Sequence, residues 1–458
     1  MAPPFFKLTT GHKKMTYASH IKAVTLLGLP LVGSHLAQMA IGVTDTVMVG
    51  WYDVTSLAAL TLASTFFFVI FVFGAGFGNA VMPMVAEASA SGDDTRVRRV
   101  TRMGLWASLG YTVLMQPVFL WSEDILLLLG QTEEVAALGE EYLRIAGIGL
   151  IPALLVVTLK SYLSALERTG VVLLSTIGAA ILNAIMNYAL IFGNWGFPEL
   201  GIRGAAIASV VNQFLPLIIL CIYARIKQPE HDLFARFWKI DGEALWEVLR
   251  LGVPIGITIL AEVGLFAAAS VMVGWFGTIE LAAHGVALQL ASVTFMVHLG
   301  LSGVATIRAG RALGEKDETR LRMGGQVVLA MSFIFSLLTI AVFVIFPDPL
   351  VSLFLAEDEP AREEIFEIAR VFMVLAALFQ LADGMQAIGI GLLRGVQDTR
   401  IPMLLAAFGY WIVGVPSGYY ISQNMGYGSP GVWGGLVIGL SVVAVLLNLR
   451  FWRRTWVQ

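Results

Sequence analysis

Charged residues are scarce in this chain of 458 residues: they make up 13% of the sequence, whereas hydrophobic residues make up 57%. Soluble domains carry roughly 25% charged residues, so this composition excludes an ordinary soluble protein. Cys221 is the single cysteine, which excludes an intramolecular disulfide and leaves a free thiol in an apolar stretch. The sequence also lacks a basic patch rich in aromatic residues, so we expect no nucleic-acid partner.

The sequence motifs of common enzymes are missing as well. There is no phosphate-binding GxxxxGK[ST] loop, which argues against nucleotide hydrolysis by that route. No GxSxG sequence is present, and no group of histidines and cysteines has the spacing of metal ligands. We therefore predict that the chain is not an enzyme and needs no cofactor.

The chain does contain long apolar stretches. A helix needs about 20 mainly apolar residues to cross the hydrocarbon core of a bilayer. Twelve stretches meet this requirement, and they predict an all-α integral membrane protein with twelve transmembrane helices. The predicted spans are 21–49, 56–86, 101–121, 138–166, 171–192, 202–226, 245–275, 281–307, 325–346, 366–393, 401–421 and 431–450.

The two halves of the sequence repeat each other. The segment "DDTRVRR" matches "DETRLRM", and the run Val-Met-Val-Gly-Trp occurs once in each half. Two pairs of segments match at an offset of 224 residues, 27–51 with 251–275 and 93–99 with 317–323. A third pair, 163–169 with 393–399, matches at an offset of 230. Because the repeated unit has six helices, an even number, we predict two parallel six-helix lobes related by a pseudo-two-fold axis along the membrane normal.

The distribution of lysine and arginine predicts the orientation of the chain. The side that holds both termini has far more of these residues than the opposite side, so both termini are expected in the cytoplasm. The predicted parts are a cytoplasmic N-terminal segment (1–20), an N-terminal lobe (21–226), a cytoplasmic linker between the lobes (227–244), a C-terminal lobe (245–450) and a cytoplasmic tail (451–458).

Three carboxylates interrupt the apolar spans. Glu262 and Asp383 lie near the middle of their spans, and Asp45 lies nearer the outer end of the first span. A charge at the centre of a bilayer costs roughly 2.5–3.5 kcal/mol on insertion scales, so such a residue suggests a function. The alternative for each is a structural pairing within the helix bundle. The repeat does not align the three acids with one another, which favours function over shared framework.

Several other polar residues lie in the spans. Asn183 and Asn187 are four residues apart and therefore share one helix face. Their amides either help to bind a cation or form an ordinary interhelical hydrogen bond, and the sequence leaves both open. Three further polar residues and one aromatic residue are candidates for lining a cavity: Gln38, Gln289, His284 and Phe379.

Three segments resemble the multidrug and toxic compound extrusion (MATE) transporters of the bacterial NorM-like branch. They are "QMAIGVTDTVMVG", "VPIGITILAEVGLFA" and "QLADGMQAIGIGLLRGVQDT". Asp45, Glu262 and Asp383 occupy the places of the functional carboxylates of that family, and the resemblance extends along essentially the whole chain. Phe379 stands where many members have a tyrosine, so this chain departs from the family pattern there.

The resemblance implies a secondary antiporter in the bacterial cytoplasmic (inner) membrane, monomeric, that exports organic, mainly cationic compounds in exchange for H⁺ or Na⁺. It implies coupling and substrate roles for Asp45, Glu262, Asp383, Asn183 and Asn187, with a Na⁺ site at Glu262 and Asp383. The alternative is a flippase for lipids or lipid-linked precursors, which shares the fold but needs Lys or Arg in its cavity for anionic headgroups. We also expect Asp45 to act as a proton-linked switch together with the two asparagines.

Overall fold

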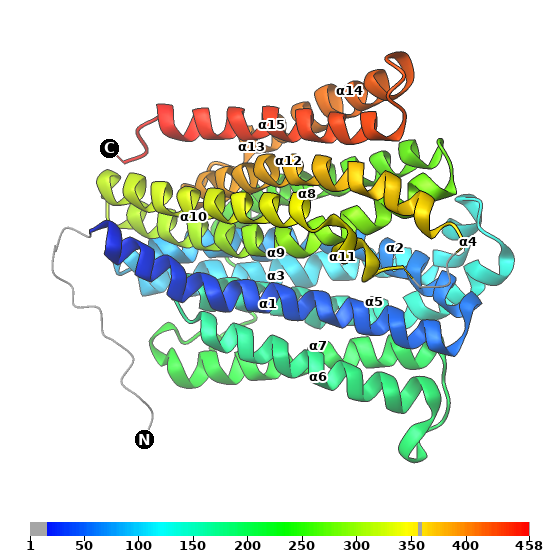
Figure 1. Cartoon of the computed structure of the whole chain (residues 1–458). Coiled ribbons are helices and arrows are strands. Elements are labelled where there is room, and N and C mark those ends of the chain that lie inside the picture. The colour runs from blue at the N-terminus through cyan, green and yellow to red at the C-terminus, as the bar shows by residue number, and fades with distance from the viewer. Residues whose placement is uncertain (1–15, 356–359, 458) are drawn as a thin grey trace.

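The computed structural model describes residues 16–355 and 360–457, and this part of the chain forms helices and turns with no strand (Figure 1). Twelve helices among these residues are long and apolar enough to cross a membrane. They match the twelve spans expected from the sequence, so the prediction of an all-α, twelve-helix membrane protein is confirmed.

The first half of the chain supplies six of these long helices, α1, α2, α3, α5, α6 and α7. Its elements are α1 (Tyr17–Tyr52), α2 (Val54–Ser91), α3 (Asp94–Leu120), α4 (Ser122–Leu128), α5 (Glu133–Ala165), α6 (Thr169–Phe192), η1 (Asn194–Gly196) and α7 (Ile202–Lys227). A short 3₁₀ turn, η2 (Pro229–His231), opens the connection to the second half.

The second half supplies the other six spans, the fifth of which is broken into four short helical segments. Its elements are α8 (Gly242–Gly274), α9 (Thr278–Gly314), α10 (Glu318–Ile345), α11 (Pro347–Ser352), α12 (Arg362–Gly395), α13 (Arg400–Ala407), η3 (Phe408–Gly414), α14 (Val415–Tyr419), η4 (Tyr420–Asn424) and α15 (Ser429–Arg453). The segments η3 and η4 are π-helical, so each turn there holds more residues than a turn of α-helix.

The sequence repeat reappears as repeated local geometry. Asp93 caps the N-terminus of α3 by accepting from the amide of residue 96, and Asp317, 224 residues later, caps α10 in the same way. Glu167 and Gln397, 230 residues apart, both follow a long helix with a positive φ, of 61° and 60°. The two halves therefore end equivalent helices with equivalent turns.

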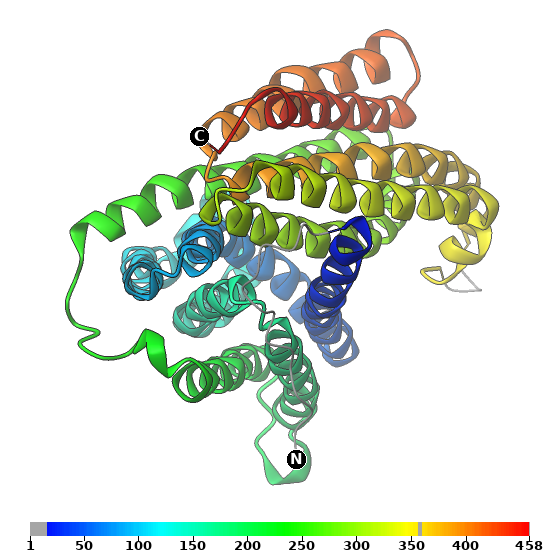
Figure 2. The ribbon, with the colours of Figure 1, turned by 90° about the vertical axis from the view of Figure 1, so that its left-hand side faces the viewer.

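Viewed end on, most of the first half lies below the second half in Figure 2. Helix α2 makes the most extensive contact between them, packing against α8 and α9 of the second half as well as α5 and α3 of its own, and α1 and α3 add further contacts with α9 and α8. We call the end of the molecule that holds the α2–α3 turn, the α9–α10 turn and residues 228–241 the basic end. Helix α1 begins and α15 ends at this same end (Figure 1).

The halves approach each other most closely through glycines. A Cβ atom on Gly76 of α2 would lie 2.5 Å from the carbonyl oxygen of Gly252 and 2.6 Å from the amide nitrogen of Gly256, both in α8. Nearer the basic end, a Cβ on Gly310 of α9 would lie 3.0 Å from the carbonyl oxygen of Pro83 in α2. Glycine at these sites lets backbone pack directly on backbone between the halves.

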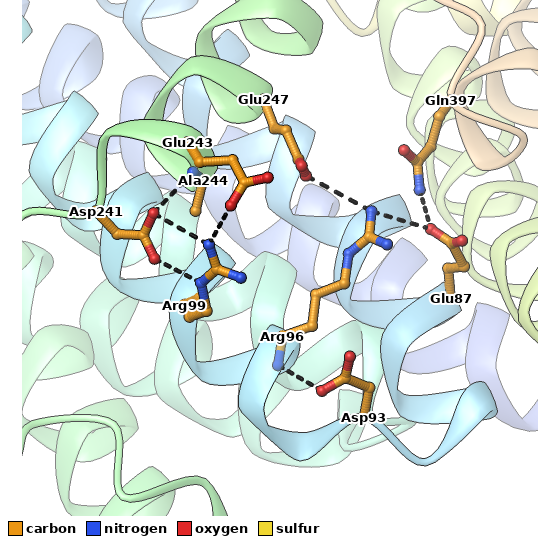
Figure 3. A network of polar contacts seen from close by, with 9 residues as sticks. All are labelled: Glu87, Asp93, Arg96, Arg99, Asp241, Glu243, Ala244, Glu247 and Gln397. Atoms are coloured by element: carbon orange, nitrogen blue, oxygen red, sulfur yellow. Dashed lines mark hydrogen bonds and ion pairs between the residues drawn. The ribbon is translucent and has the colours of Figure 1, made fainter.

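A polar network joins the halves at the basic end (Figure 3). The guanidinium of Arg96 lies between the carboxylates of Glu87 and Glu247, at 3.6 and 3.5 Å, and so bridges α2, α3 and α8. Gln397, just after α12, donates to Glu87. Because Glu247 and Gln397 belong to the second half, this network links the halves where the glycines have already brought them together.

The connection between the halves is also tied to α3. Arg102 donates to the carbonyl oxygens of Asp232 and Leu233, at 2.6 Å each. The indole of Trp106 donates to the carbonyl oxygen of Phe237 at 2.8 Å and stacks on its ring. This segment is therefore ordered against the first half and is not a loose tether.

Candidate functional site

The first half holds a carboxylate inside its bundle. Asp45 of α1 faces α6, where Asn183 and Asn187 lie on one face, as their spacing predicts. The amide nitrogens of Asn183 and Asn187 donate to Asp45 Oδ1 at 2.9 and 2.6 Å. The hydroxyl of Ser209 in α7 donates to Oδ2 at 3.5 Å. The structure therefore brings together the three predicted residues of this half and adds a serine.

The chemistry of this cluster suits a carboxylate that changes its charge. Both asparagine side chains are fully buried, and each amide donates to an ionised carboxylate or can turn its oxygen to accept from a protonated one. The Oδ1 atom of Asn187 has no hydrogen-bond partner among the described residues. It is therefore free to accept a hydrogen bond from a bound group.

The second half holds the other two acids. Glu262 of α8 accepts a hydrogen bond of 2.8 Å from the amide of Gln386 in α12. Asp383, one turn before Gln386 on the same helix face, is 2% exposed, and its Oδ1 has no hydrogen-bond partner in the described part of the chain. The carboxylates of Glu262 and Asp383 interact electrostatically with each other, so this half carries a close acidic pair.

A cavity of about 240 Å³ opens onto this acidic pair. Its wall contains both carboxylates, Ser292, and a majority of apolar side chains, four of them phenylalanines. Ten of the eleven lining residues belong to α8, α9 and α12 of the second half, and Phe68 of α2 is the lining residue from the first half. The full lining is Phe68, Glu262, Val263, Phe266, Leu288, Ala291, Ser292, Phe295, Met296, Phe379 and Asp383.

The four residues proposed from sequence as cavity lining have different positions. Phe379 lines the cavity and packs edge-on against Phe266. His284 lies on α9 one turn from Leu288, but it is buried, hydrogen-bonded to Ser270 at 3.0 Å and covered by Trp433. It is therefore not part of this wall.

Gln289 and Gln38 are not part of the cavity wall either. Gln289 follows the lining residue Leu288 and points to a neighbouring face of α9, where it is partly buried. Gln38 lies on an exposed face of α1. Of the four candidates, only Phe379 contributes to the described cavity.

Sequence reasoning missed two groups that contact the acids. Gln386 is three residues after Asp383, so helix periodicity alone could have placed it on the same face. Ser209 carried no signal, because an isolated serine in an apolar span is usually a packing residue. Both are now part of the candidate sites through the hydrogen bonds given above.

Comparison with known proteins assigns the family. The family model described as MatE matches residues 30–189 and 254–420, one stretch in each half. The chain belongs to the MatE family. This confirms the resemblance seen in the sequence.

Curated relatives of this MATE chain carry the same name in several bacteria. The chain is 47% identical to "Probable multidrug resistance protein NorM" of Rhizobium meliloti (strain 1021), over 97% of the chain and 96% of that protein. It is 46% identical to the protein of that name in Agrobacterium fabrum, over 95% of the chain and 94% of that protein. We therefore describe the chain as a MATE multidrug efflux transporter, not an enzyme.

Solved structures share the fold. A multidrug resistance MATE family transporter in an outward-facing conformation matches with a TM-score of 0.87 at 20% identity, over 95% of the chain and 96% of that structure. A MOP superfamily transporter from Pyrococcus furiosus, whose structure is described as having a binding pocket of reverse polarity, matches with a TM-score of 0.86 at 21% identity, over 97% and 98%. The predicted two-lobe architecture agrees with these neighbours.

Proposed function

We propose that this MATE transporter exports organic cations in exchange for H⁺ or Na⁺, with Glu262 and Asp383 as the acids for which substrate and coupling ion compete. The supporting observation is the cavity on the second half, which combines two carboxylates with four phenylalanines. An apolar, aromatic wall with a few charged groups suits a drug-sized ligand, and aromatic faces attract cations. Because ion and drug compete for the same negative site, binding of one favours release of the other, and this gives exchange between them.

The alternative function, lipid or lipid-linked precursor flipping, is not favoured by the same cavity. An anionic headgroup needs positive side chains in the binding site. The residues that line the described cavity include two acids and no lysine or arginine. The chain therefore has the polarity expected for a cationic substrate.

Asp45, Asn183 and Asn187 form a second coupling group in this proposal. Protonation of Asp45 would remove the charge that attracts a cationic drug, and the two amides can satisfy both forms of the carboxylate. The rival role is a structural link between α1 and α6. A pH series on Asp45→Asn separates these roles and is described in the Discussion.

The proposed orientation places the basic end in the cytoplasm, so both termini, the 1–20 and 451–458 segments and the 227–244 linker are cytoplasmic. The molecule is then closed toward the cytoplasm, since the Gly310 contact and the polar network lie toward that end. Single cysteines at the exposed Thr95 and Thr319 should react with an impermeant thiol reagent only after cells are opened. Labelling of intact cells at either position would show that the orientation is opposite to the proposed one.

The proposed exchange is tested with the full-length protein in proteoliposomes loaded with a fluorescent organic cation. Efflux is measured under an imposed H⁺ gradient, under a Na⁺ gradient and with neither. Glu262→Gln and Asp383→Asn should each reduce gradient-driven efflux to the level of empty liposomes, because each variant removes one of the two charges for which ion and drug compete.

Glu364→Gln is the matched control, since Glu364 is an exposed acid in the first turn of the helix that carries Asp383. It should export at the parent rate. Parent-like efflux in both cavity variants would exclude the acids from coupling. Efflux in the parent that is equal with and without gradients would exclude antiport itself.

A further inference from the structure

Three buried oxygen atoms beside Glu262 lack hydrogen-bond partners within the described residues. They are Asp383 Oδ1, Gln386 Oε1 and the hydroxyl oxygen of Tyr410. The three side chains are 2%, 1% and 0% exposed, respectively. Buried polar atoms are nearly always paired, so three unpaired oxygens around one carboxylate indicate a ligand that takes oxygen donors. Two of them come from the acid-bearing helix α12, but Tyr410 comes from another part of the chain.

Tyr410 reaches this place through the π-helical segment η3. A single π-helical turn inside a longer helix often marks a functional site, because its wider turn changes which side chains point inward. The next residue, Trp411, donates its indole N–H to the carbonyl oxygen of Ala261 at 3.2 Å, directly beside Glu262. This bond fixes the register of η3 against α8. The Tyr410 hydroxyl then lies within electrostatic reach of both Glu262 and Asp383.

The repeat provides an independent comparison. In the first half, the partner of the carboxylate on the first long helix comes from the fifth, where Asn183 and Asn187 face Asp45. In the second half, Glu262 is also on the first long helix, and η3 interrupts the fifth. Tyr410 therefore lies on the fifth span of the second half, which corresponds to the helix that carries Asn183 and Asn187 in the first half.

The charges at this place match a monovalent cation. Glu262 and Asp383 bring two negative charges, and Arg394, a partly buried residue of α12, interacts electrostatically with Glu262 and brings one positive charge. One negative charge is left over. The hydrogen bond from Gln386 to Glu262 also fixes the amide so that its oxygen, the better ligand for a hard cation, remains unpaired.

We propose that Tyr410 and Gln386 complete, with Glu262 and Asp383, a four-residue oxygen site for Na⁺, and that the Tyr410 hydroxyl determines whether the site accepts Na⁺. This inference rests on the proposed function, in which the two acids bind the coupling ion. It adds a ligand from η3 in a chain whose Phe379 brings no hydroxyl to the cavity wall. A protonated carboxylate needs no such set of ligands, so loss of the hydroxyl weakens Na⁺ binding and leaves proton binding in place.

The test measures how Na⁺ raises the melting temperature of the purified full-length protein, with choline replacing Na⁺ at constant ionic strength. The parent should be stabilised by Na⁺ and not by choline. In Tyr410→Phe, the Na⁺ concentration for half of the effect should rise about 10- to 100-fold. Tyr419→Phe, in the neighbouring α14 and 50% exposed, is the matched control and should behave as the parent.

Stability in choline alone separates a ligand from a structural residue. Because the hydroxyl of Tyr410 has no hydrogen-bond partner among residues 16–355 and 360–457, Tyr410→Phe should be at least as stable as the parent without Na⁺. A variant that unfolds in choline, or one that keeps the parent's Na⁺ response, overturns the assignment. If the parent exports drug under a H⁺ gradient but gains no stability from Na⁺, this inference fails while the proposed function stands. Failure of the parent to export under either gradient refutes the proposed function instead.

Discussion

Replacing Gly76 with alanine should weaken the closed arrangement of the two halves. The added Cβ would lie 2.5 Å from the carbonyl oxygen of Gly252, whereas ordinary van der Waals contact begins at 3.4 Å. Helices α2 and α8 must therefore move apart by the difference, 0.9 Å, and the obstacle is backbone, which has no rotamer to change. Overpacking of this kind costs about 1–3 kcal/mol. Because the contact joins the two halves, this cost applies to the closed arrangement and is relieved when the halves separate there.

A cost of about 1–3 kcal/mol corresponds to a roughly 5- to 150-fold change in the ratio of the closed to the open arrangement. Spin labels on cysteines at Thr95 and Thr319 report this ratio through the distance between them, measured by double electron–electron resonance. The two positions are exposed and equivalent in the two halves. Cys221 is first replaced by serine, since it is the sole native cysteine. In Gly76→Ala, the population with the longer distance should increase.

Gly110→Ala in α3 is the matched control, because a Cβ there would meet nothing within 4 Å. The control should keep the parent's distance distribution. If Gly76→Ala gives the same distribution as Gly110→Ala, the glycine contact does not set the balance between the two arrangements.

Two further predictions concern Asp45 and Asp241. Asp45→Asn should bind cationic drug more weakly at neutral pH and lose the parent's pH dependence while keeping its melting temperature; parent-like pH dependence, measured by drug binding across a pH series, would refute the switch. Arg99, which donates to Asp241 at 2.5 Å, lowers the pKa of Asp241 below its ordinary value of 3.8. The ion pair therefore stabilises the fold above pH 3.8 and loses this effect as the pH falls through the lower, folded-state value. Asp241→Asn keeps an N-cap residue for α8, so its melting temperature should fall below the parent's at neutral pH and the difference should shrink in acid. A difference in melting temperature that does not change with pH would mean that the charge of Asp241 contributes nothing to stability.

The number and placement of the helices were predictable from the sequence, because a span needs only length and low polarity. The long apolar runs are not interrupted by soluble segments, and the repeat fixed how the two halves relate. The cluster of Asp45, Asn183 and Asn187 was also predictable. Two amides on one helix face have few partners in an apolar bundle other than a carboxylate.

The surroundings of Glu262 could not be predicted in the same way. Tyr410 interacts electrostatically with both acids and lies in the π-helical segment η3, where the regular helical period assumed from a sequence pattern does not hold. His284 was expected in the cavity wall, yet it is covered by Trp433 because its turn of α9 lies beyond the cavity. Both outcomes depend on contacts between distant parts of the chain, which a helical pattern does not contain.

The contacts that close the basic end are suited to repeated opening. The ion pairs of Arg96 involve side chains that are 37% exposed on the arginine and 42% on Glu247, and exposed pairs contribute only about 0–1 kcal/mol each. The glycine contacts bring backbones together, but apolar side chains of the two halves also meet: Leu27 and Leu31 of α1 belong to the same buried cluster as Leu301 of α9. A ligand must supply about 5.5 kcal/mol of differential affinity to reverse a 99-to-1 equilibrium. The ion pairs are therefore the part of the closure that one bound cation or drug can shift most easily, because separating the shared apolar cluster costs more.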